Sequence, residues 1–153
     1  MLSIREQALA AFFNRFAGLT EYPLRKRMPN WLIDVNDLPA LVQLDGGSSP
    51  LGGDDVSSGI SGIVRIALRV SIVIGINASN TDVLGPELSK ARADVLKAAL
   101  ANPTLDGIVE HVRWDGDEDP VTLLEEGSPP HAILAINFVI IHTEAELDPF
   151  SAI

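Results

Sequence analysis

Four acidic side chains in the C-terminal third have the spacing of a calcium-binding loop. The first, third, fifth and twelfth ligand positions of such a loop are matched by Asp115, Asp117, Asp119 and Glu126. The sixth position needs glycine for a sharp turn, but it is Pro120 here, and no helical pattern flanks the segment. We therefore interpret residues 115–130 as a solvated acidic loop and expect no metal or other cofactor.

Other patterns that could carry catalysis do not occur in usable form. His111, His131 and His142 lack the spacing of a helical metal pair and are interpreted as ordinary strand residues. The chain has no cysteine, which excludes thiolate zinc sites and cysteine nucleophiles. No glycine-rich phosphate loop with its lysine and no Gly-x-Ser-x-Gly elbow is present. The sequence therefore predicts that the protein is not an enzyme.

A run of three basic residues, Arg25, Lys26 and Arg27, contrasts with the rest of this acidic chain. The run could be an ionic docking site for an acidic surface on a partner or on a neighbouring copy. It could equally be a turn that only aids solubility. Both interpretations remain open from the sequence.

The bulk properties restrict the class of protein. The 153 residues fit one domain with a real hydrophobic core, taken here as residues 1–153. The formal net charge of -10 disfavours a grip on nucleic acid through its phosphates. The N-terminus does not resemble a signal peptide, and the longest apolar tract, residues 60–76, contains Arg65 and Arg69. We expect a soluble protein that does not enter a membrane.

Two helices are expected. Ser3 and Glu6 have the spacing of a capping box, followed by apolar residues at helical intervals, so the first helix is predicted over residues 3–17. The second is predicted to begin at Gly85-Pro86-Glu87, because proline is favoured at the first helical position. Pro103 should end it.

The remaining chain predicts strands. The clearest is residues 66–76, where apolar and other side chains alternate strictly. Further strands are expected at the four places listed here: residues 38–44, residues 108–114, residues 132–142 and a short extended segment around Pro29 and Trp31. Residues 45–62, rich in glycine and serine, predict a long flexible loop. With short connections between strands, the fold class expected is α+β, a mainly antiparallel β-sheet with two α-helices packed on one face.

Several short segments, taken in order, resemble one known family. They are residues 4–9 on the first helix, residues 38–42 followed by Asp45-Gly46, the helix end and link at residues 99–107, and a closing strand before Asp148-Pro149-Phe150. In this order they resemble the tail terminator, or tail completion, family of long-tailed bacteriophages, whose members are small α+β proteins. The resemblance covers nearly the whole chain, although each segment is short.

The resemblance implies a structural virion protein of the tail and neck, assembled in the host cytoplasm. Such a protein forms a six-membered homo-oligomeric ring on the last ring of the tail tube protein, stops tube polymerisation and presents the surface to which head-tail connector proteins join. DNA would only pass through the lumen. The residues expected to face neighbours or the lumen lie in the loop 45–62 and in the acidic segment, which includes Asp115, Asp117, Glu118 and Asp119; plain solvation of both segments is the alternative.

Two other functions remain open from the sequence. One is a different ring component of the neck or tube, such as a head-tail joining protein, because the loop 45–62 is long and few residues follow Phe150. The other is a small acidic binding domain, or an enzyme with a site built from scattered acids. A monomer with a compact polar pocket would favour the latter.

Overall fold

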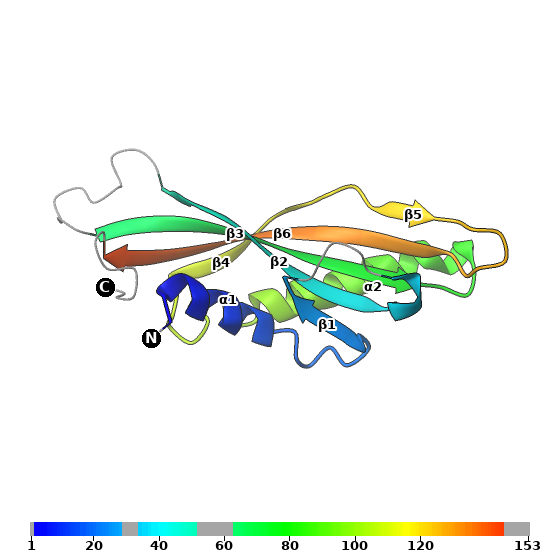
Figure 1. Cartoon of the computed structure of the whole chain (residues 1–153), viewed down its shortest axis with the longest axis horizontal. Helices are drawn as coiled ribbons and strands as arrows, with labels where there is room; N and C mark the ends of the chain where they lie inside the picture. Colours follow the sequence, from blue (N-terminus) through cyan, green and yellow to red (C-terminus); the bar gives the residue numbers. More distant parts are fainter. Residues whose placement is uncertain (1, 29–33, 52–62, 146–153) are drawn as a thin grey trace.

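A twisted six-stranded sheet dominates the molecule (Figure 1). The computed structural model describes residues 2–28, 34–51 and 63–145. In chain order the elements are α1 (Ile4–Asn14), β1 (Leu24–Arg27), the short 3-10 helix η1 (Val35–Asp37), β2 (Ala40–Pro50), β3 (Ile63–Asn77), α2 (Thr81–Leu100), β4 (His111–Asp117), β5 (Val121–Leu123) and β6 (His131–Ala145). The expected α+β class is confirmed.

The strand order across the sheet is β1-β2-β3-β6-β4, and β5 pairs with β6 beyond the end of β4. Only β1 and β2 run parallel; the other pairs are antiparallel. The centre is formed by β3 and β6, which pair along their whole length from Ile63 opposite Ala145 to Asn77 opposite His131. Consequently β1 forms one edge of the described sheet, and β4 with β5 forms the other.

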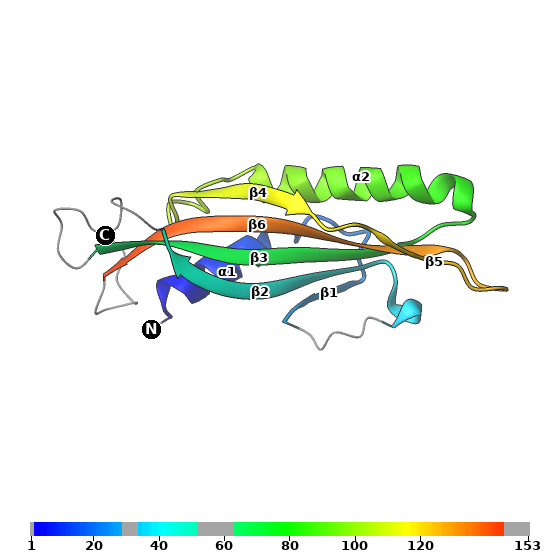
Figure 2. The same cartoon turned by 90° about the horizontal axis from the view of Figure 1, so that it is seen from above.

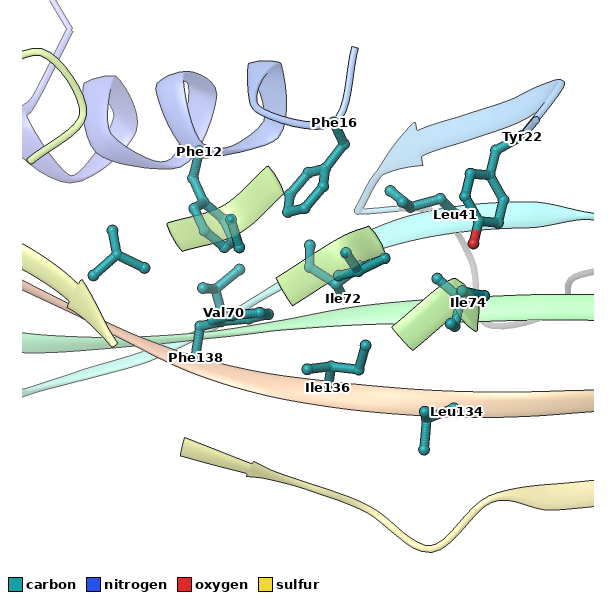
Figure 3. Close-up of a cluster of buried hydrophobic side chains, with 14 of the residues drawn as sticks. Phe12, Phe16, Tyr22, Leu41, Val70, Ile72, Ile74, Leu134, Ile136 and Phe138 are labelled. Atoms are coloured by element: carbon teal, nitrogen blue, oxygen red, sulfur yellow. The ribbon is translucent and has the colours of Figure 1, made fainter. Parts of the chain in front are cut away.

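Both helices cover the same face of the sheet, as expected. Apolar residues of β3 and β6 meet them in one core, in which Phe12 on α1 and Phe16 in the turn after it point toward Val70, Ile72 and Phe138 (Figure 3). The second helix runs along the β6 and β4 side of the sheet (Figure 2). The alternation at residues 66–76 had predicted the part of this buried face that β3 contributes.

The caps of both helices differ in part from the prediction. The Ser3 hydroxyl accepts from the Glu6 amide as expected, at 3.2 Å, but the Glu6 carboxylate accepts hydrogen bonds from Arg27. The second helix begins at Thr81, earlier than predicted, because the Asn80 side chain accepts from the amides of the first turn. Pro86 therefore lies inside this helix and not at its first position.

Three predicted loop or turn segments contain strands. The basic run is β1, paired with the start of β2. The expected flexible loop 45–62 was wrong in its first part, since β2 continues to Pro50 opposite β3; residues 52–62 lie outside the described residues, as does the extended segment around Trp31. The acidic loop 115–130 was also too long, because β4 reaches Asp117 and β5 follows. In each case the backbone hydrogen bonds to a longer neighbouring strand outweigh the loop-like composition of the segment.

Gly46 is needed where β2 passes β3 at an irregularity of the register. A Cβ at this position would lie 2.7 Å from the carbonyl oxygen of Arg69, a backbone atom that cannot move aside. A Cβ at Gly75 would lie 2.5 Å from Cδ2 of Leu38, the end of a flexible side chain. We expect Gly46→Ala to lower the free energy of unfolding by about 1–3 kcal/mol and Gly75→Ala by less than about 1 kcal/mol. Urea denaturation of both variants checks this; equal losses would contradict it.

Candidate functional site

The charged residues singled out in the sequence lie at opposite edges of the one sheet. Arg25, Lys26 and Arg27 form β1, and we call residues 24–27 the basic edge. Asp115 and Asp117 lie on β4, and Glu118 and Asp119 follow directly; we call residues 115–121 the acidic edge. The two groups are separated by the full width of the sheet (Figures 1 and 2). No single pocket is formed from them.

Within the basic edge, Arg27 is used by the fold itself. Its guanidinium donates to both carboxylate oxygens of Glu6 at 2.6 and 2.8 Å and, through Nε, to Asp45 at 2.9 Å. The Asp45 side chain is only 5% exposed and also accepts from the Gln43 amide. Hydrogen bonding to Arg27 lowers the pKa of Glu6, and the pKa of Arg27 is raised in return. This network fastens α1 to β1 and β2.

The other two basic residues differ in their freedom. The Arg25 guanidinium lies 5.2 Å from the centroid of the Phe13 ring on α1, a cation-π distance. Lys26 is exposed and projects from the other face of the strand. Of the three predicted docking residues, Arg27 thus holds the fold together, Arg25 packs against α1, and Lys26 is available to a partner.

The acidic edge contains a second local network, between β4 and α2. The Trp114 Nε1 donates to Asp117 at 2.9 Å, and Arg92 forms an ion pair with the same carboxylate while lying 5.1 Å from the centre of the Trp114 ring. Gly116 lies at the irregularity in the β4 register and has a φ of +93°. Glycine adopts this left-handed conformation without strain, which allows the geometry around Asp117. The Asp117 carboxylate is therefore held within the protein by Arg92 and Trp114.

Glu118 belongs to a polar row on the face of the sheet opposite the helices. It accepts from the Asn137 amide at 3.1 Å, and the Asn137 oxygen accepts from the Ser71 hydroxyl at 2.7 Å. Asp115 and Arg69 line the same shallow hollow. The Ser71 hydroxyl thus donates to an amide oxygen, which is no base, so the row does not form the nucleophile and base pair that covalent catalysis needs.

The calcium-loop spacing does not produce a calcium loop in the fold. Its segment runs between β4 and β6 and includes β5, where a helix-loop-helix would be required. Across the part of the chain that the structure describes, no group of three or more His, Asp or Glu side chains is placed to hold a metal ion.

Exposed apolar side chains begin at the last residue of the acidic edge, Val121, a feature that the sequence reasoning missed. Val121, Leu123 and Leu124 are 54%, 41% and 64% exposed. The first two belong to β5, which pairs with β6 on one side only among the described residues. A short strand with apolar side chains and an open backbone edge is suited to contact with another polypeptide. Their position inside an acidic stretch had hidden this signal.

Two histidines of β6, His131 and His142, are buried at 1% exposure. For His142, burial lowers the pKa below its usual value; the positive charge of Arg5 lowers it further, and a backbone hydrogen bond at Thr143 opposes the shift. Its Nδ1 lies 3.8 Å from the carboxylate of Glu144, whose own pKa is raised by burial. The imidazole is therefore held in its neutral form.

This burial predicts a pH effect on stability. As the pH falls below 6.5, the unfolded chain binds a proton at His142 before the folded chain does, so the free energy of unfolding should fall until the lowered folded pKa is reached. The fall is limited to about 1.4 kcal/mol per pH unit for one proton. Urea denaturation at pH 7.5 and 5.5 should show a smaller loss in His142→Gln than in the parent, since the other groups cancel. An identical loss in both would contradict the assignment.

A scan against protein-family models and a search of curated proteins gave no match to this chain. Within residues 2–28, 34–51 and 63–145, no helix combines the length and the apolar character that a membrane crossing requires.

Proposed function

We propose that this chain is a structural virion protein of a long-tailed phage that caps the tail tube as a ring, ends tube polymerisation and forms the surface to which the head joins. The proposal rests on the ordered resemblance to tail terminator proteins. The structural observation that supports it is the pair of open sheet edges of opposite charge: the basic edge on β1, and the acidic edge, which runs from β4 to the first residue of β5.

In a ring of identical subunits, one surface of each subunit contacts a different surface of the next subunit. Contacts between different surfaces of identical subunits close into a ring when each contact adds a rotation, whereas self-complementary patches give dimers. An open sheet edge offers unpaired backbone donors and acceptors as well as side chains. This molecule has two such edges in its described part, and they differ in charge, as a head-to-tail contact needs.

The overall charge is also suited to a DNA conduit. A formal net charge of -10 repels the phosphates of a passing duplex and keeps it from binding to the wall. In this proposal the partners are further copies in a hexameric ring, the tail tube protein below and the head-tail connector or neck proteins above. The protein acts by assembly, with no catalytic step and no cofactor.

The decisive test uses phage particles that lack this protein. We expect tails that are overlong or without heads in negative-stain micrographs, and normal particles after purified protein is added back. Tails of normal length that still fail to join heads would favour a joining protein of the neck. Normal particles in the absence of the protein would overturn the proposal and favour a small acidic binding domain.

A further inference from the structure

We propose that neighbouring copies join edge to edge, with the basic edge of one copy lying antiparallel to the acidic edge of the next and Lys26 facing Glu118. This inference rests on the proposed ring and specifies its contact. The occupant of each edge is thus a second copy of this chain. The argument has four parts: height along the sheet, strand direction, side-chain face and charge.

The position of a residue along the strand direction, here called its height, can be compared between the two edges through the paired residues of the sheet. Arg27, at the end of the basic edge, and Asp117, on the acidic edge, lie at the same height. Arg27 is paired with Gln43, which is paired with Ile72 on the next strand. Ile72 is paired with Ile136, and Ile136 is paired with Asp117. A straight line across all five strands therefore joins Arg27 at one edge to Asp117 at the other.

The other end of the basic edge is matched in the same way. Leu24 is paired with Ala40, and Ala40 with Gly75. Gly75 is paired with Ile133, which is paired with Val121 at the start of β5. The two edges therefore occupy the same stretch of the sheet, with an apolar residue at one end of each.

Equal height matters because a closed ring adds rotation without translation along its axis. If the strands run along that axis, each residue of one edge meets the residue of the next copy at its own height.

The directions of the two edges also fit an antiparallel contact. From Leu24 to Arg27 the chain climbs from the height of Ile133 to that of Ile136, and from Asp117 to Val121 it descends between the same two heights. The contact would be antiparallel.

Lys26 and Glu118 agree in height and in face. Lys26 is paired with Val42, Val42 with Val73, and Val73 with Ala135, while the Glu118 amide donates to the Ala135 carbonyl at 2.9 Å. Paired residues on adjacent strands share a face, here the face opposite the helices. The Glu118 carboxylate lies on that face too, through its bond to Asn137. Both side chains are exposed.

Charge selects this contact over the symmetrical ones. Two basic edges in contact would place like charges opposite one another, and so would two acidic edges, which destabilises a strand pair. The basic edge against the acidic edge places Lys26 opposite Glu118. The exposed Val121 would meet the neighbour at the height of Leu24, so apolar surface is buried beside the ion pair.

Charge reversal tests the contact in the tail-completion assay. Lys26→Glu and Glu118→Lys should each raise the protein concentration needed for half-maximal rescue of tails by at least about tenfold. The double variant with both changes should return to within about threefold of the parent, and Lys97→Glu, a reversal on the exposed side of α2, should have no effect. Single variants that rescue like the parent would overturn the edge contact while leaving the ring function intact.

Disulfide trapping gives a direct geometric test, because the chain contains no cysteine. Oxidation of a Lys26→Cys and Glu118→Cys double variant, assembled on tails, should give a ladder of covalent multimers that ends at a closed ring. The Lys97→Cys and Glu118→Cys pair should give none. Dimers from Lys26→Cys alone would show a symmetrical contact and overturn the inference. A double variant that completes tails but yields no ladder would overturn it as well, whereas a parent protein that cannot complete tails would overturn the ring function itself.

Discussion

Replacement of Phe12 by alanine is expected to lower the free energy of unfolding by about 3–5 kcal/mol, the range for large aromatic residues removed from a core. Phe12 is fully buried, and its ring lies 5.2 Å from that of Phe16 and 5.3 Å from that of Phe138. The ring therefore joins α1 to the central strand β6 (Figure 3). Since small domains are stable by about 5–15 kcal/mol, this loss is a large fraction of the total. Urea denaturation followed by circular dichroism measures it.

The adjacent Phe13 is the matched control. It is on the same helix and has the same side chain, but it is only partly buried and contacts Arg25 at the basic edge. Phe13→Ala should therefore lower the free energy of unfolding by no more than about 1 kcal/mol. If both variants lost the same amount, the core described around Phe12 would be wrong. The comparison separates the packing of α1 on the sheet from helix propensity, which both substitutions change alike.

The parts of the fold that the sequence predicted are those in which local pattern and burial agree. Strict alternation identified the central strand, which the structure extends to Ile63–Asn77. The serine before the first helix was recognised as its cap because the cap needs only a residue type and a short spacing. The buried side of the second helix, including Ala91, Val95 and Ala99, has the helical spacing by which such a face is recognised in a sequence.

The misassigned parts are those decided by distant contacts. Three consecutive cations have no strand pattern, and β1 forms because it pairs with β2 while Arg27 reaches Glu6 and Asp45. Residues 45–50 have the composition of a loop, but β3 continues beside them and supplies backbone partners. Pro86 predicts a helix start because proline is favoured at the first helical position, but the Asn80 cap begins the helix earlier, at Thr81. Such pairings depend on tertiary structure and are not encoded in a short window.

For the candidate site, the sequence predicted which residues carry the charges but not where those residues lie relative to one another. It singled out both charged clusters, yet their equal height at opposite edges follows only from the register of five strands. It also treated the three basic residues as equivalent. The structure divides their roles, since Arg27 is held by two carboxylates and Lys26 is exposed. This division predicts that substitutions at adjacent positions of one strand act on different properties.

Removal of the Arg27 side chain is accordingly expected to act on stability. Arg27→Ala leaves the nearly buried Asp45 carboxylate and the Glu6 carboxylate without their cation. Breaking a fully buried ion pair costs about 3–5 kcal/mol, and partial exposure of Arg27 and Glu6 reduces the expected loss to about 2–3 kcal/mol. Urea denaturation at pH 7 measures it. Lys26→Ala, the neighbouring control, should change the free energy of unfolding by less than about 0.5 kcal/mol.

The pH dependence of this loss identifies its cause. Because Arg27 lowers the pKa of Glu6 in the folded protein, the stabilisation is complete above the unfolded value of 4.5 and disappears as the pH falls through the lowered folded pKa. The difference between the parent and Arg27→Ala should therefore shrink in acid below pH 4.5. A difference that persists unchanged there would mean that Arg27 acts through its packing and not through its charge. Lys26→Glu should show the reverse behaviour, with unchanged unfolding and impaired assembly, because its charge is directed outward from the same strand that Arg27 fastens to the fold.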